Sequence, residues 1–117
     1  MAKALLVGTV SKGQKDNTVE LLKELERLAD TSGIKTIDSV VQKIEKPNPK
    51  FFIGEGKVFE IKKICEEKSI DAVIFDNELT ATQQRNLEEH IHSRIIDRTR
   101  LILNIFAQRA RTQEAQL

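Results

Sequence analysis

The chain has 117 residues, of which 39% are hydrophobic and 32% are charged, and its formal net charge is +1. This length fits one domain, and the composition excludes a disordered chain because it supplies enough apolar surface for a core. No apolar run reaches the roughly 20 residues that a helix needs to cross a bilayer. With a single cysteine and no signal-peptide pattern, the sequence predicts a cytoplasmic domain with no membrane partner, no disulfide and no cysteine-based zinc site.

The first half of the chain alternates apolar strands with an amphipathic helix. Residues 4–10 are a short apolar run, typical of a strand buried on both faces. Asn17 and Glu20 have the spacing of a capping box, which predicts that a helix begins there, and Gly33 is the residue type that commonly ends one. A second strand is predicted over residues 36–44.

The second half continues the same alternation after an irregular proline-containing segment. Thr80 and Gln83 form a second capping pair. Ile102, Ile105 and Phe106 recur at helical spacing, so we expect them to pack on the sheet. The predicted elements are a helix over residues 57–68, a strand over 72–75, a helix from 80 to about 92, a short strand at 95–96 and a helix from about 99.

Alternation of strands and helices predicts an α/β fold with right-handed crossovers. We expect a small four-stranded parallel sheet, doubly wound in the order 2-1-3-4, with helices on both faces. The last helix carries no stop signal before Leu117. We therefore expect an α/β domain over residues 1–98, followed over residues 99–117 by the start of a long helix that continues in a longer protein.

Two glycine-containing loops invite a comparison with phosphate-binding motifs. The loop over residues 8–15 has Gln14 where a phosphate-binding loop needs its lysine, which favours a plain flexible loop. Gly54 and Gly56 open a helix and are a candidate anion or nucleotide loop, because backbone N–H groups at a helix start can face an anion. The alternative, which we favour, is that these glycines permit a tight entry into the helix.

The sequence offers little catalytic chemistry. His90 and His92 lie two positions apart on a predicted helix and so point in different directions, which excludes a shared metal ion. Cys65 lies on the apolar side of its helix, as expected of a small core residue. Asp76 follows a strand and is expected to cap the next turn. We therefore expect no catalytic residue, no metal site and no cofactor in this chain by itself.

Arginines concentrate at the C-terminal end. Residues 94–117 hold five arginines against two carboxylates, a net charge of +3, which leaves −2 for residues 1–93. Guanidinium groups pair with phosphates, so a nucleic-acid contact is one hypothesis. The alternative is a solvated helix face with ion pairs, in which Arg98 meets Asp97 or Asp76. The candidate contact residues are Arg94, Arg98, Arg100, Arg109 and Arg111, with Lys57 as a further candidate.

Three stretches of the chain carry a family resemblance. They are Phe52-Ile53-Gly54-Glu55-Gly56-Lys57-Val58, then Asp76-Asn77-Glu78-Leu79 continuing through Gln83-Gln84-Arg85-Asn86-Leu87-Glu88, and Ile96-Asp97-Arg98-Thr99 continuing through Ile105-Phe106-Ala107-Gln108-Arg109-Ala110-Arg111-Thr112. In order and spacing they resemble the N-terminal domain of the HflX family of translational GTPases. The resemblance covers the whole chain.

The resemblance implies a longer protein, in which a helical hairpin and a GTPase domain follow this one and the GTPase domain binds GTP and magnesium. It implies a factor that acts on the large ribosomal subunit and splits stalled ribosomes under stress. This domain would contact ribosomal RNA (rRNA) and restrain its own GTPase domain. The alternatives are an ATP-binding accessory domain or a structural docking domain for the GTPase, in which Arg98 and Asp97 join the sheet to the next helix. We also expect the end of the last helix, without its hairpin partner, either to pair with another copy of the chain or to fray.

Overall fold

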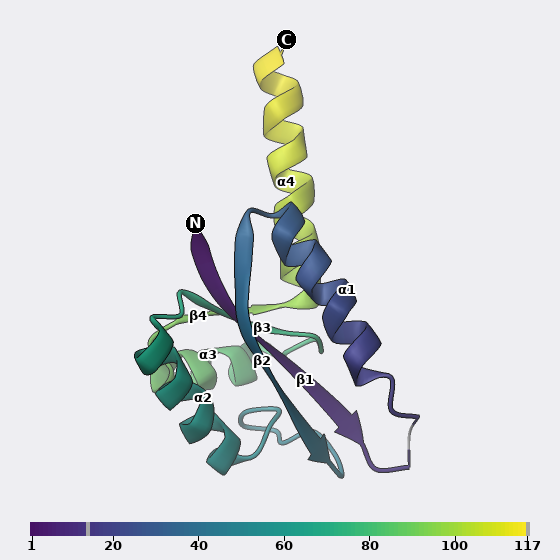
Figure 1. Cartoon of the computed structure of the whole chain (residues 1–117), viewed down its shortest axis with the longest axis vertical. Helices are drawn as coiled ribbons and strands as arrows, with labels where there is room; N and C mark the ends of the chain where they lie inside the picture. The colour runs from purple at the N-terminus through teal and green to yellow at the C-terminus, as the bar shows by residue number, and fades with distance from the viewer. Residues whose placement is uncertain (14, 117) are drawn as a thin grey trace.

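A computed structural model of the chain describes residues 1–13 and 15–116, and the side chains of residues 1–13 and 15–110. Strands and helices alternate along the chain (Figure 1), as the sequence predicts. The elements are β1 (Ala2–Ser11), α1 (Thr18–Thr31), β2 (Ile34–Ile44), α2 (Glu55–Lys68), β3 (Ala72–Phe75), α3 (Ala81–His90), β4 (Arg94–Asp97) and α4 (Arg98–Gln116).

The four strands form one parallel sheet in the order β2-β1-β3-β4, which confirms the predicted fold class and strand order. β1 pairs with β3 only as far as Val7, whereas its pairing with β2 continues to Ser11. The ends of β1 and β2 therefore extend past the rest of the sheet as a two-stranded ribbon. The pairing of β1 with β2 also shifts register: Ala4 pairs with Thr36 and Leu5 with Asp38, which leaves Ile37 as a bulge in the edge strand.

Helices cover both faces of the sheet and create two apolar cores (Figure 1). Successive residues of a strand point to opposite faces, so Leu5 and Leu6 belong to different cores. α2 and α3 cover one face, together with the buried segment 51–53, and α1 and α4 cover the other. The central strand β1 is consequently buried on both sides, as its continuous apolar run predicts.

Gly8 lets α1 approach β1 closely. A Cβ at Gly8 would lie 2.9 Å from Cγ2 of Thr18 and 3.2 Å from Cδ2 of Leu22. Both of these residues are buried on the inner side of α1. The close packing of this helix on the central strand therefore requires the absence of a side chain at Gly8.

One predicted capping box forms and the other does not. Thr80 accepts a hydrogen bond from the N–H of Gln83, whose side chain accepts from the N–H of Thr80 in return. The capping box predicted at Asn17 is wrong, since its side chain makes no capping bond. Asp16, one residue earlier, accepts instead from the N–H of Thr18 at 3.1 Å, so a different side chain bonds the start of this helix.

The last helix, α4, begins at the residue after β4 and then leaves the body of the domain (Figure 1). Leu101 and Ile105 are buried against the sheet, whereas Phe106 is 61% exposed. The prediction that Phe106 packs on the sheet is therefore wrong: Leu101 takes that role, and Ile102 is only half-buried. The projecting helix makes the molecule elongated, at 50 × 31 × 25 Å.

Candidate nucleic-acid interface

Arg98 lies at the carboxyl edge of the sheet and is bound by two carboxylates. One guanidinium nitrogen donates to Oε1 of Glu24 on α1 at 2.5 Å, and the other donates to Oδ1 of Asp76 at the end of β3 at 3.2 Å. Partial burial lowers the pKa of Arg98, but the two acidic partners outweigh that effect and the net pKa is raised. Arg98 is thus an internal ion-pair residue. The alternative interpretation of the arginines includes this pair of Arg98 with Asp76.

Asp97 is occupied as well, but by backbone N–H groups and not by a guanidinium group. Its Oδ1 accepts from the N–H of Arg100 at 2.9 Å, which caps the start of α4, and its Oδ2 accepts from the N–H of Leu79 at 3.0 Å. The residue is only 4% exposed. Both carboxylate oxygens therefore satisfy backbone donors that the fold would otherwise leave without a partner.

Arg94 and Arg100 are brought together, although they come from different elements. Arg94 is the first residue of β4 and Arg100 lies in the first turn of α4; both are exposed. They line one shallow groove of about 260 Å³ between α3 and α4, and Glu88 is the acidic residue in its lining. This groove is the place where the structure gathers two of the predicted contact residues.

The other predicted contact residues lie elsewhere. Arg109 is exposed on α4 but nine positions after Arg100, which is about half a turn around the helix at 3.6 residues per turn. Lys57 belongs to α2, on the opposite face of the sheet, and pairs with Glu60 at 2.8 Å. The side chain of Arg111 lies outside the described residues. Where the structure describes their side chains, the candidate cations consequently do not form one continuous surface.

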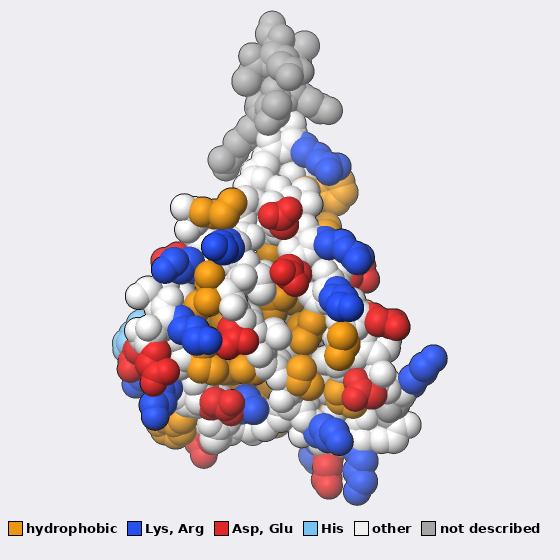
Figure 2. All heavy atoms as spheres, viewed as in Figure 1, with side chains coloured by type: hydrophobic (Ala, Val, Ile, Leu, Met, Phe, Trp, Pro, Cys, Tyr) orange, Lys and Arg blue, Asp and Glu red, His pale blue; other side chains and the backbone are white. Residues whose placement is uncertain are grey.

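The surface view agrees with that dispersal. Figure 2 shows Lys and Arg side chains interspersed with Asp and Glu over the visible face, rather than gathered over one element. A mixed surface of this kind gives weak long-range attraction for a polyanion. Any specific contact with phosphates must therefore come from a local pair of cations.

The glycine loop at the start of α2 is held by its neighbours. The N–H of Gly54 donates to Oε1 of Gln42 on β2 at 3.0 Å, and a Cβ there would lie 3.3 Å from the same side chain. Gly56 has open space around it. These contacts match a tight helix entry, and the use of Gly54 and Gly56 by an anion or nucleotide stays a prediction.

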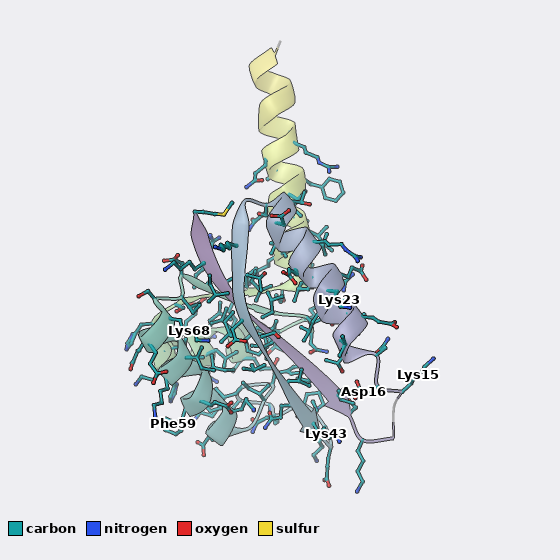
Figure 3. All side chains as sticks on the ribbon, viewed as in Figure 1. Lys15, Asp16, Lys23, Lys43, Phe59 and Lys68 are labelled. Atoms are coloured by element: carbon teal, nitrogen blue, oxygen red, sulfur yellow. The ribbon has the colours of Figure 1, made fainter. Side chains whose placement is uncertain are left out.

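A second cavity was not anticipated from the sequence. It has a volume of about 480 Å³ and lies where β1 and β2 end, lined by Val10, Ser11, Lys12, Gly13, Asp16, Lys43, Ile44 and Glu45. Lys15, Asp16 and Lys43 are labelled in Figure 3 beside this end of the sheet. The sequence signal that could have predicted this cavity is the parallel pairing of two strands that both end in lysine-containing segments. The lining of the cavity contains two lysines and two carboxylates, so it carries no net charge.

Within the parts of the chain that the structure describes, no cluster of three potential metal ligands is present. The helices of these same parts include none with the length and apolar character needed to cross a membrane. Cys65 is buried in the core beneath α2, as predicted, and burial raises the pKa of its thiol.

Comparison with known proteins points to one family. Residues 19–107 match the family described as GTP-binding GTPase N-terminal. The chain is 45% identical over 115 residues to the GTPase HflX of Flavobacterium psychrophilum, covering 97% of this chain and 28% of that protein. It is 43% identical over 102 residues to the GTPase HflX of Escherichia coli K12, covering 87% of this chain and 24% of that protein.

A solved structure shows the same arrangement of elements. A GTP-binding protein from the hyperthermophilic archaeon Sulfolobus solfataricus, crystallised in complex with GDP, superposes with a TM-score of 0.66 at 26% identity. The match covers 92% of this chain and 30% of that one. The chain thus spans about a quarter to a third of the length of the relatives that it matches.

Proposed function

The chain belongs to the HflX family of GTPases, and we propose that it serves as the N-terminal, ribosome-docking part of a GTP-binding protein. The proposed partner is rRNA of the large subunit, and the proposed role of the whole protein is to split stalled ribosomes. GTP and magnesium would bind to a domain outside this chain. This chain would bind RNA and position that domain, without chemistry of its own.

The pair Arg94 and Arg100 is the observation that carries the RNA proposal. Both side chains are exposed, they line the same groove, and neither forms an ion pair within the described residues. A guanidinium group binds phosphate through two parallel N–H donors, so two neighbouring arginines suit consecutive phosphates of a strand. The chain has no Trp and no Tyr, which favours backbone contacts over base stacking.

The remaining cations contribute less to this proposal. Arg98 already satisfies Glu24 and Asp76, so a phosphate would have to displace a carboxylate to reach it. Arg109 lies on another side of α4, and Lys57 on another face of the sheet. We therefore place the principal contact at the groove between α3 and α4.

Filter binding of the 117-residue chain to large-subunit rRNA, across a series of salt concentrations, tests the proposal. Replacing both groove arginines (Arg94→Ala with Arg100→Ala) should weaken binding and lower the slope of log K against log salt by about 1.5–2, because two phosphate contacts are lost. The charge-matched control is Arg27→Ala with Lys63→Ala, two exposed cations on α1 and α2. Equal effects of the two double variants, or no effect of either, would overturn the proposal.

A further inference from the structure

The loop between β3 and α3, residues 76–80, is tied at both ends to the junction of β4 and α4. At one end, Asp76 accepts from the guanidinium of Arg98 at 3.2 Å. At the other, the N–H of Leu79 donates to Oδ2 of Asp97 at 3.0 Å. Because α4 begins directly after β4, no flexible linker separates these ties from the helix.

The same loop is also joined to the central strand. The hydroxyl of Thr9, near the end of β1, donates to Oδ1 of Asn77 at 2.8 Å. β1 and β3 are adjacent in the sheet, and the chain crosses to opposite sides of this pair. In doubly wound sheets, the carboxyl ends of two such strands are where ligands approach. The loop therefore lies at that edge and contacts the start of α4.

Asp97 is the connecting residue because it performs two tasks with one side chain. Its Oδ1 caps α4 through the N–H of Arg100, while its Oδ2 holds the loop through Leu79. A buried carboxylate that is fixed by two backbone donors has little freedom to rotate. If the loop moves, the carboxylate must move with it or lose a bond, and the start of α4 follows.

From these contacts we infer that Asp97 couples the loop over residues 76–80 to the direction of α4, so that the loop and the helix change position together. From Phe106 to Ala110 the side chains of α4 are exposed, so a small rotation at its first turn is amplified along its length. An α-helix rises about 1.5 Å per residue, which gives the 19 residues of α4 a length of about 28 Å. The inference does not depend on RNA binding.

Asp97→Asn separates the two tasks. The amide oxygen of Asn can still accept from Arg100 and cap the helix, since Asn is a good N-cap residue. The amide nitrogen then faces Leu79 and cannot accept a hydrogen bond. The matched control is Asp71→Asn, because Oδ2 of Asp71 also accepts from a backbone N–H, that of Lys3, but at the opposite edge of the sheet.

Two measurements are needed, one on the loop and one on the direction of α4. Amide exchange measured by NMR reports the bond to Leu79. Electron spin resonance distances between labels at Lys63→Cys on α2 and Ala110→Cys on α4, with Cys65→Ala, report the direction of the helix. In Asp97→Asn we expect exchange at Leu79 to be faster by about tenfold or more, with a broadened label distance and continued protection of Arg100. Asp71→Asn should change none of these.

The inference is overturned if exchange at Leu79 accelerates while the label distance keeps the width of the unmodified chain. A second variant covers the case in which Asp97→Asn does not fold. Thr9→Val removes the tie of the loop to β1 at nearly constant volume and leaves every bond of Asp97 in place. Coupling predicts a broadened label distance in this variant too, and an unchanged distance would overturn the inference.

Discussion

Glu24 and Arg98 lie 74 positions apart in the chain, yet their side chains form an ion pair that joins α1 to the first turn of α4. The same guanidinium reaches Asp76 at the end of β3, whose side chain is only 11% exposed. One arginine thus links three elements at one edge of the sheet. Its removal would affect the fold before it affected any partner.

Arg98→Ala is therefore expected to lower the free energy of unfolding by about 1–3 kcal/mol, since it leaves the largely buried Asp76 without its charged partner. Arg94→Ala, at an exposed position without an ion pair among the described residues, should change it by less than about 0.5 kcal/mol. Urea denaturation followed by circular dichroism compares the two variants. Equal losses would contradict the assignment of Arg98 as an internal ion-pair residue.

Gly8→Ala should destabilise the domain by about 1–3 kcal/mol, because the new Cβ would overlap with Thr18 and push α1 away from β1. Gly56→Ala is the matched control. Gly56 lies inside α2 with open space around it, so alanine there should be neutral or stabilise by up to about 1 kcal/mol. Thermal unfolding of both variants gives the comparison, and a tolerated alanine at Gly8 would argue against the close helix approach.

The two capping sites should respond differently to alanine. Thr80→Ala removes a capping bond that the structure shows, and should cost about 0.5–2 kcal/mol. Asn17→Ala removes a side chain that makes no capping bond, and should cost less than about 0.5 kcal/mol. Chemical denaturation checks both, with Thr80→Ser as the variant that retains the hydroxyl and the stability.

The apolar residues of α4 should also differ in how much each contributes to stability, according to whether the side chain is buried or exposed. Leu101 is fully buried, so Leu101→Ala should cost about 2–5 kcal/mol. Phe106→Ala removes a ring that is 61% exposed, and should cost no more than about 1 kcal/mol. A large loss of stability in the Phe106 variant would mean that the side chain is covered in solution.

Two aspartates should make the domain less stable in acid. A hydrogen bond from Lys68 lowers the pKa of Asp38, and a bond from the N–H of Thr18 lowers the pKa of Asp16. The unfolded chain then binds protons more readily than the folded one, so this stabilisation is present above pH of about 4 and is lost as pH falls through the folded pKa values.

Denaturation midpoints measured between neutral and acidic pH should fall less steeply for the double variant Asp16→Asn with Asp38→Asn than for the unmodified chain. The double variant should also be the less stable of the two at neutral pH. Parallel curves for the two proteins would show that neither carboxylate contributes to the acid sensitivity.

Local patterns predicted the fold because they depend on neighbouring residues. The Thr80 capping box forms between residues three positions apart, and the strand order follows from the alternation of elements. The failure at Asn17 has the same origin: Asp16 bonds the N–H of Thr18 at the start of the helix, and spacing alone does not show which of two adjacent side chains bonds a helix N–H.

The sequence did not predict side-chain contacts where a helix carries more apolar residues than it can bury, or where the two partners lie far apart in the chain. The start of α4 contains Leu101, Ile102, Leu103, Ile105 and Phe106, which together cover most of the helix circumference. Helical periodicity therefore leaves more than one choice of buried side. The partner of Arg98 on α1 could not be inferred either, because only the tertiary packing of α1 against α4 brings Glu24 near it.

The unpaired residue Ile37 has a consequence for solubility. β2 is a long strand on the outside of the sheet, and a straight strand in that position offers a template on which further chains can add. The bulge bends the exposed backbone near the first third of the strand, and the charged Lys35 and Asp38 lie within two positions of it. An incoming strand would meet an interrupted row of donors and acceptors, so this edge discourages fibril-like growth of one molecule on another.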